Sequence, residues 1–254
     1  MTQVIPQGFS KGHGTGNDFV LVADADGSAP LTPERVRALA DRRFGVGGDG
    51  VIRAVRAGAT GVAILDSAAE GTWAMDYWNA DGSVSEMCGN GVRVFVRYLL
   101  EAGLEQLPDG GAIDVATRAG VKRVMRRGEL LSVDLGPFEL GEMALVAADG
   151  LEVDRPGLLV STGNPHVVVA LASEDELAGL DLHRAPSLDP APVDGANVEF
   201  VVPGAIADGI GSIRMRVHER GVGETLSCGT GAVAAAMATR HWSGDAADRW
   251  IVDV

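Results

Sequence analysis

The chain has 254 residues, enough for one large or two medium domains, and its hydrophobic fraction of 46% can fill a buried core. The formal net charge of −14, with no run of Lys or Arg, disfavours nucleic acid or an anionic membrane surface as a partner. Residues 1–10 lack the basic and apolar regions of a signal peptide, and no apolar run reaches the about 18 residues of a membrane span. We therefore expect a soluble, cytoplasmic protein.

Short strands and two helices are predicted in the first half of the chain. Strands are predicted over Phe19–Ala23, Gly61–Asp66 and Thr72–Trp78, the last followed by a turn at 79–82. A helix is predicted over Leu31–Phe44, because Thr32 is a favoured N-cap and Pro33 a favoured first residue. Apolar residues at helical spacing predict a second helix after Cys88, which Gly103 would end.

The second half follows the same plan. Strands are predicted over Leu158–Ser161 and Val167–Leu171, around a turn at 163–165, and a hairpin over Asn197–Val202 and Ile213–His218. An Ala-rich helix is predicted from Cys228 to about Trp242. Thr-Gly-Asn, strands, Cys-Gly-x-Gly and a helix thus occur twice in this order, with 71 residues from Asn17 to Cys88 and 64 from Asn164 to Cys228.

This repetition predicts an α+β fold of two pseudo-symmetric domains, with the active site in a cleft between them. We place the boundary near Val133–Pro137. The N-terminal half, residues 1–132, carries Cys88, and the C-terminal half, residues 133–254, carries Cys228.

The two cysteines of the chain each open a Cys-Gly-x-Gly segment at the start of a predicted helix. The N–H groups and dipole at such a position favour the thiolate, so we expect the pKa of each thiol to fall below the free value of about 8.5. Two thiols facing each other across a cleft could remove a proton from one face of a carbon and return one to the other. The pair therefore indicates a racemase or epimerase that works by two bases.

Other interpretations of these motifs are weaker. The segment Gly45–Gly50 matches the dinucleotide fingerprint, but it follows a predicted helix rather than a strand. The five histidines and two cysteines lack the spacings of a zinc site, so no metal is expected. His166 or the pair Glu219 and Arg220 could be structural, yet their places beside the repeated motifs favour a site.

Five segments in family order resemble the diaminopimelate epimerases, which are pyridoxal-independent isomerases of LL- and meso-2,6-diaminopimelate in lysine and peptidoglycan precursor biosynthesis. The segments are Lys11–Phe19, Asn79–Ser83, Met87–Arg93, Gly163–His166 and Glu219–Gly231. The resemblance covers nearly the whole chain. It implies a strand-rich sheet around a central helix in each domain, diaminopimelate as the small-molecule substrate, no cofactor and a homodimer.

The resemblance also implies a role for each matching residue. Cys88 and Cys228 would be the two acid/base residues, and His166 and Glu219 would tune the pKa of their thiols. The backbone N–H groups of two dipeptides would hold the reacting carboxylate, namely Gly89-Asn90 and Gly229-Thr230. Polar side chains would contact the other polar groups of the substrate: Asn17, Asn79, Asn164, Asn197, Glu219 and Arg220, the last as a carboxylate clamp.

The sequence departs from the family pattern at two places. Gly50 stands where many members have Gln, so only its backbone could contact the substrate. Family members also continue beyond the position of Val254 with a Gly-rich turn and closing strands, so the chain is expected to be truncated relative to the family.

Three alternatives to this function remain open. A proline or hydroxyproline racemase shares the fold and the thiol pair, but its first motif typically carries His at the position of Asn90 and an Asp stands near its second cysteine. A thiol redox switch would use the same two cysteines to form a disulfide on oxidation. An amino-acid-binding protein would not need two activated thiols.

Overall fold

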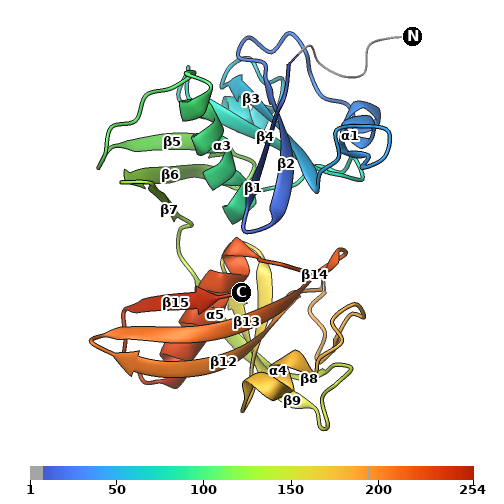
Figure 1. The fold of residues 1–254 in the computed structure, drawn as a ribbon, viewed down its shortest axis with the longest axis vertical. Helices are drawn as coiled ribbons and strands as arrows, with labels where there is room; N and C mark the ends of the chain where they lie inside the picture. Colours follow the sequence, from blue (N-terminus) through green and yellow to red (C-terminus); the bar gives the residue numbers. More distant parts are fainter. Residues whose placement is uncertain (1–7, 194) are drawn as a thin grey trace. The chain divides into compact units, whose positions relative to one another are not determined.

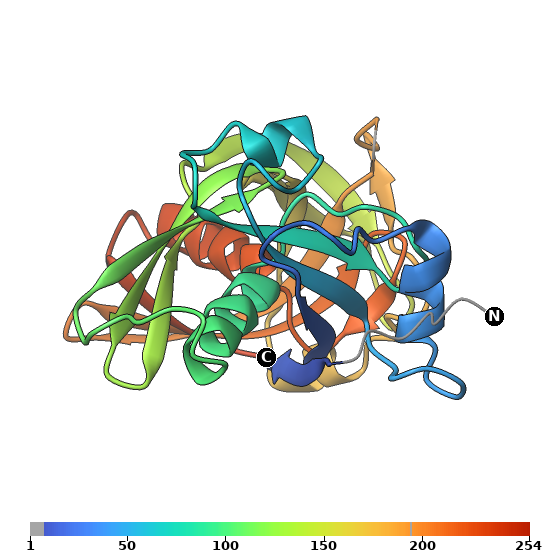
Figure 2. The same cartoon turned by 90° about the horizontal axis from the view of Figure 1, so that it is seen from above.

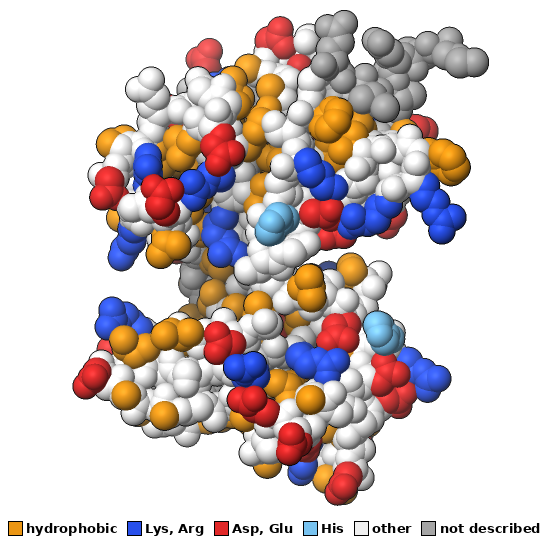
Figure 3. Space-filling view, viewed as in Figure 1, with side chains coloured by type: hydrophobic (Ala, Val, Ile, Leu, Met, Phe, Trp, Pro, Cys, Tyr) orange, Lys and Arg blue, Asp and Glu red, His pale blue; other side chains and the backbone are white. Residues whose placement is uncertain are grey.

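The computed structural model describes residues 8–193 and 195–254. Residues 1–7, where the sequence predicts no signal peptide, lie outside the described part. The chain forms two compact units, Met1–Leu135 and Gly136–Val254; the sequence-based boundary was placed after residue 132. In the described part of the chain, no helix is both long and apolar enough to cross a membrane. On the face shown in Figure 3, Lys and Arg side chains are interspersed with Asp and Glu on each unit.

Unit 1 is one seven-stranded sheet whose strands are neighbours in chain order. The strands are β1 (Ser10–Gly14), β2 (Asn17–Ala23), β3 (Gly50–Arg56), β4 (Trp73–Asn79), β5 (Ala112–Thr117), β6 (Gly120–Arg127) and β7 (Leu130–Asp134). The helices are α1 (Pro33–Ala40), α2 (Ala63–Asp66) and α3 (Gly89–Glu101). Strands β1, β3, β5, β6 and β7 were not predicted from the sequence.

Helix α3 is the centre of unit 1. Val92, Phe95, Val96 and Leu99 are fully buried on one side of the helix, at the spacing that the sequence predicted. The helix contacts β1, β2, β3 and β7, so the sheet curls around it from its first strand to its last. Figure 2 shows the helix (green) from above. Each of these side chains contributes roughly 1.5–3 kcal/mol by leaving water.

Two predictions about local structure in unit 1 need correction. The strand predicted over Gly61–Asp66 is wrong, because Ala63–Asp66 is the short helix α2. Asp66 accepts hydrogen bonds from the backbone N–H groups of Gly58 (2.8 Å) and Thr60 (3.1 Å), which folds this segment back on itself. Helix α1 has the predicted N-cap Thr32, but it ends at Ala40, because Asp41 accepts from the N–H groups of Arg43 and Phe44 and forms a turn.

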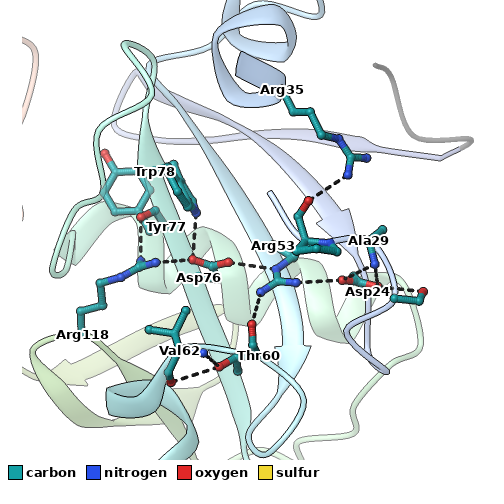
Figure 4. A network of polar contacts seen from close by, with 12 residues as sticks. Asp24, Ala29, Arg35, Arg53, Thr60, Val62, Asp76, Tyr77, Trp78 and Arg118 are labelled. Atoms are coloured by element: carbon teal, nitrogen blue, oxygen red, sulfur yellow. Dashed lines mark hydrogen bonds and ion pairs between the residues drawn. The ribbon is translucent and has the colours of Figure 1, made fainter. Parts of the chain in front are cut away.

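A buried ion network joins β3 and β4 of unit 1 to segments that flank the strands (Figure 4). The Arg53 side chain donates to Asp24 (3.0 Å), Asp76 (2.9 Å) and the carbonyl of Thr60 (2.8 Å). Arg118 donates to the other oxygen of Asp76 at 2.6 Å. Arg53 is only 1% exposed, so these bonds compensate the loss of its hydration.

Unit 2 contains an eight-stranded sheet. The strands are β8 (Glu139–Ala147), β9 (Arg155–Ser161), β10 (Pro165–Ala170), β11 (Ser187–Asp189), β12 (Asn197–Ala207), β13 (Ile210–Glu219), β14 (Gly223–Thr225) and β15 (Arg249–Asp253). The helices are α4 (Glu174–Ala178) and α5 (Gly229–Trp242). The predicted hairpin is confirmed, since β12 and β13 pair antiparallel. Helix α5 contacts β9, β10, β12, β13 and β15, and its buried alanines permit this close packing.

The two units share one topology. In unit 1, the four successive pairs from β1–β2 to β4–β5 are antiparallel, parallel, antiparallel and parallel. In unit 2, the same sequence of pairings joins β9, β10, β12, β13 and β15. A helix precedes the fifth strand in both series, α3 in unit 1 and α5 in unit 2. Five strands and one helix of unit 1 therefore correspond one to one to five strands and one helix of unit 2, as expected from the repeated motifs.

Candidate active site

Both cysteines are the N-cap residues of the central helices. Cys88 has φ −137° and ψ 121°, and Cys228 has φ −114° and ψ 116°, so each is extended where the helix begins. The N–H of Gly91 donates to the Cys88 sulfur at 3.3 Å, and that of Gly231 to the Cys228 sulfur at 3.4 Å. The sulfur thus takes the place that a Ser or Asp oxygen takes in ordinary caps, and the prediction that each cysteine opens a helix is confirmed.

Both helix starts pack onto the sheet at their third residue, tightly at Gly91 and closely enough at Gly231 to require glycine. A Cβ at Gly91 would lie 3.5 Å from both Ile52 and Phe19. A Cβ at Gly231 would collide with the carboxyl oxygen of Glu199. The glycines of the repeated motif therefore bring each thiol and the neighbouring N–H groups close to strand ends.

In unit 1, three predicted site residues lie at the same end of three neighbouring strands. Asn17 begins β2, Gly50 begins β3 and Asn79 ends β4, with Gly50 opposite both Phe19 and Asn79. The Cys88 thiol donates to Asn17 Oδ1 at 3.5 Å. The amide of Asn79 instead donates to the Ser83 hydroxyl at 3.0 Å within its own turn.

Asp49 holds the Asn17 amide in place, and the sequence did not identify it. Asn17 Nδ2 donates to Asp49 Oδ2 at 2.9 Å, and the other oxygen of Asp49 accepts from Arg42 at 2.7 Å. This orientation leaves Asn17 Oδ1 for the thiol. An acidic residue beside Gly50, at the start of a strand that pairs with β2, was the available signal.

Two predicted contacts of unit 1 are limited to the backbone. Asn90 is 1% exposed, and its side-chain oxygen accepts from Thr15 and Arg93, so its N–H is the group that could face a ligand. A Cβ at Gly50 would lie 2.6 Å from both the Trp78 carbonyl and the Tyr77 ring. The glycine at the usual Gln position is therefore enforced by packing.

In unit 2, the predicted residues again gather at strand ends beside the helix. Thr230 Oγ1 lies 3.4 Å from the Cys228 sulfur and accepts from Asn164 Nδ2 at 3.5 Å. Asn164 Oδ1 in turn lies 3.1 Å from His166 Nε2. His166 is fully buried, and its Nδ1 lies 2.7 Å from Glu199 Oε1.

Three further predicted residues lie at the adjoining ends of β12 and β13. Asn197 begins β12, and its side-chain oxygen accepts from the backbone N–H of Arg220 at 2.9 Å. Glu219 ends β13 and accepts from the Thr225 hydroxyl. The Arg220 side chain is exposed. Gly229 begins α5 directly after Cys228.

The expectation of a lowered thiol pKa is wrong for Cys228. Burial raises the pKa of this thiol well above its ordinary value, and the nearby carboxyl groups of Glu219 and Glu199 raise it further. The hydrogen bonds from Thr230 and the Gly231 N–H lower it, but they do not outweigh burial. Cys228 therefore carries its proton at neutral pH.

Glu199 is the second site residue that the sequence analysis missed. It lies near the start of β12, fully buried among apolar neighbours. A single Glu inside the run Val198–Val202 was a usable signal, because a carboxyl group is seldom buried without a specific partner.

Comparison with known proteins assigns the family. The family model described as diaminopimelate epimerase matches residues 9–140 and 158–253. A diaminopimelate epimerase of Mycolicibacterium smegmatis is 45% identical over 250 residues, which cover 93% of this chain and 83% of the relative. One of Streptomyces coelicolor is 49% identical over 245 residues, covering 93% of this chain and 79% of the relative.

Solved structures of lower identity share the fold. A hydroxyproline epimerase from Agrobacterium vitis matches with a TM-score of 0.56 and 16% identity, covering 93% of this chain and 77% of that chain. A phenazine biosynthesis protein of the PhzF family from Bacillus anthracis matches with a TM-score of 0.55 and 16% identity, covering 91% of this chain and 78% of that chain. The predicted α+β two-domain fold is confirmed. By its sequence and fold, this chain belongs to the diaminopimelate epimerase family of isomerases.

Proposed function

We propose that this chain interconverts LL- and meso-2,6-diaminopimelate through proton transfer at the α-carbon by Cys88 and Cys228, without a cofactor. The observation that carries this proposal is the matched geometry of the two thiols. Each sulfur caps a helix and accepts the N–H of the third helical residue, Gly91 or Gly231. Family membership supplies the substrate.

The reaction needs one thiolate and one thiol on opposite faces of the α-carbon. The thiolate takes the α-proton, the electron pair of the C–H bond passes into the carboxylate, and the other thiol returns a proton to the opposite face. We infer that Cys228 is the thiol at rest, because burial and nearby carboxyl groups raise its pKa. Cys88 then becomes the base once its thiol has released the hydrogen that it donates to Asn17, and the reverse reaction exchanges the two roles.

The developing carbanion is the energetic obstacle in this reaction. Backbone N–H groups of Gly89-Asn90 and Gly229-Thr230 lie at helix starts, where they have no partner within the helix and the dipole favours negative charge. Each well-placed donor supplies roughly 3–4 kcal/mol to such a transition state. We assign these groups to the α-carboxylate of the substrate.

The remaining polar residues would select the substrate. Diaminopimelate carries an ammonium and a carboxylate at each end, so it needs both acceptors and donors. We assign this recognition to Asn17, Asn79, Asn164, Asn197, Glu219 and Arg220, and the tuning of the thiols to His166 and Glu219 together. The exposed guanidinium of Arg220 suits the distal carboxylate.

The working form is proposed to be a cytoplasmic homodimer in which each chain provides both epimerase halves, residues 1–132 and 133–254. The proline-type racemases share the fold, but Asn90 of this chain occupies the position of their His. A redox switch would act in the disulfide form, whereas proton transfer needs both thiols reduced.

Proton NMR of LL-diaminopimelate in D₂O tests the function. We expect the reduced protein to exchange the α-proton and form the meso isomer, and Cys88→Ser and Cys228→Ser each to abolish epimerisation. Proline and hydroxyproline in parallel samples test the related racemases. A folded, reduced protein that exchanges neither diaminopimelate nor the prolines would refute the assignment.

A further inference from the structure

The shared topology of the two units reveals a chemical difference beneath their helices. Phe19 lies opposite Gly50 in unit 1, and His166 lies opposite Asn197 in unit 2, at the same place in the two strand series. Two residues further along the partner strand stand Ile52 in unit 1 and Glu199 in unit 2. The apolar pair Phe19 and Ile52 beside Gly91 thus corresponds to the polar pair His166 and Glu199 in unit 2, of which Glu199 lies beside Gly231.

The pair in unit 2 is connected to the thiol by an unbroken series of polar contacts. We call the series Glu199, His166, Asn164, Thr230 and Cys228 the Glu199 chain. Its successive distances are 2.7, 3.1, 3.5 and 3.4 Å. In unit 1, Cys88 instead donates to Asn17.

The direction of each contact in the Glu199 chain can be assigned. Asn164 Oδ1 can only accept, so His166 Nε2 carries a hydrogen. Asn164 Nδ2 then donates to Thr230 Oγ1, which leaves the Thr230 hydroxyl hydrogen free to point at the Cys228 sulfur. One proton must lie between His166 Nδ1 and Glu199 Oε1, since a lone pair facing a carboxylate oxygen at 2.7 Å would repel it. The pair is thus neutral as a whole, whichever atom holds that proton.

The burial of Glu199 indicates that its contact with His166 is functional, because packing does not explain a carboxyl group at this place. Both side chains of the pair have 0% exposure. Glu199 Oε2 is buried with no hydrogen-bond partner among the described residues, an arrangement that is unfavourable by itself. The rest of β12 around Glu199 is apolar, so packing alone would favour a residue such as the Ile of unit 1.

The geometry points to Glu199 as a positioning residue that, through His166 and Asn164, directs the Thr230 hydroxyl at Cys228 and so makes the two thiols chemically unequal. This inference rests on the proposed function, in which Cys228 is one of the two acid/base residues. Glu199 acts on Cys228 in two opposite ways: its charge raises the pKa of the thiol, whereas the hydrogen bond from Thr230 that it helps to direct lowers that pKa. Because the His166–Glu199 pair is neutral as a whole, we take the second effect as the larger. The other acidic group acting on Cys228 is Glu219 on β13.

The test is a titration of each thiol by the ultraviolet absorbance of its thiolate. Cys88→Ser leaves Cys228 as the sole thiol, and Cys228→Ser leaves Cys88. Glu199→Ile transfers the residue of unit 1 into unit 2, and Glu199→Gln introduces a side-chain amide that can donate to His166 Nδ1. Ile52→Val is the packing control at the matching position of unit 1.

We expect Glu199→Ile to raise the pH of Cys228 thiolate formation by about one unit, a tenfold smaller thiolate fraction at fixed pH. Glu199→Gln should raise the pH of Cys228 thiolate formation by less than about a third of a unit. Neither substitution should change the pH of Cys88 thiolate formation. A lower titration pH in both Glu199 variants would show that Glu199 acts as a charge and would overturn the inference. Equal shifts of the two thiols, or no shift in a folded Glu199→Ile protein, would do the same.

A milder variant covers the case in which Glu199→Ile does not fold. Thr230→Val removes the hydroxyl that contacts Cys228 in the Glu199 chain while keeping the side-chain shape. It should raise the pH of Cys228 thiolate formation to a similar extent. An unchanged titration in Thr230→Val would overturn the inference on its own. Because the titrations need no turnover, they remain decisive even if the wild-type protein fails to epimerise diaminopimelate. In an active enzyme, Glu199→Ile should also lower kcat about tenfold with KM within about twofold.

Discussion

Asn17 accepts the thiol hydrogen of Cys88 at 3.5 Å through the side-chain oxygen that its own bond to Asp49 leaves available. The amide cannot rotate to present its nitrogen to the sulfur without losing the 2.9 Å bond to the Asp49 carboxylate. A carboxylate that does not touch the thiol thus decides which group of Asn17 faces it.

Asp49→Ala should therefore lower kcat by about tenfold, corresponding to about 1.4 kcal/mol, because the Asn17 amide loses its orientation. Asp49→Asn keeps an acceptor for Asn17 and should cost less. Steady-state kinetics with diaminopimelate measure both. Unchanged kcat in a folded Asp49→Ala protein would show that Asn17 is held by other means.

The buried Arg53 should be essential for the stability of unit 1. Arg53→Met removes the arginine partner of buried Asp24 and one of the two arginine partners of buried Asp76, and it should lower the free energy of unfolding by about 3–5 kcal/mol. Urea denaturation measures the loss. The control is Arg123→Ala, which breaks an ion pair with a 61% exposed side chain and should cost about 1 kcal/mol or less. Similar losses in the two variants would contradict the importance of burial.

Restoring the common family residue at Gly50 should harm this chain. Gly50→Gln places a Cβ 2.6 Å from the Trp78 carbonyl and the Tyr77 ring, so we expect a loss of about 1–3 kcal/mol in stability and no gain in activity. Gly8→Gln, where no atom lies within 4 Å of the added Cβ, is the control. Thermal unfolding and steady-state kinetics measure the two effects. A Gly50→Gln protein that is as stable as wild type and more active would contradict the prediction.

The raised pKa of Cys228 predicts a dependence of stability on alkaline pH. Because the folded pKa is above the unfolded value of about 8.5, its contribution is fully present below that pH and is lost as pH rises through the folded pKa. Stability should therefore fall more steeply above about pH 8.5 in wild type than in Cys228→Ser. Urea denaturation across this range measures the difference, and parallel curves for the two proteins would argue against a raised pKa.

The sequence by itself determined the features that depend on neighbouring residues. The Cys-Gly-x-Gly segments form helix starts because an N-cap and a first turn are local structures, and the repeat of these segments predicted two related units. The hairpin of β12 and β13 followed from alternation of apolar residues over Ile213–His218. Most candidate site residues were implied by the resemblance to the diaminopimelate epimerases, through motifs that lie at strand or helix ends.

Only the tertiary structure decided the features that depend on residues far apart in the chain. Asp66 folds its segment into a helical turn, although the apolar run 61–66 alone was equally compatible with a strand. His166 and Glu199 are 33 residues apart, and they meet because β10 and β12 are parallel neighbours. The helix start favours a Cys228 thiolate locally, but burial and the carboxyl groups of β12 and β13 raise the pKa of the thiol. Desolvation depends on everything packed around a group, so the protonation of this thiol is a property of the folded unit.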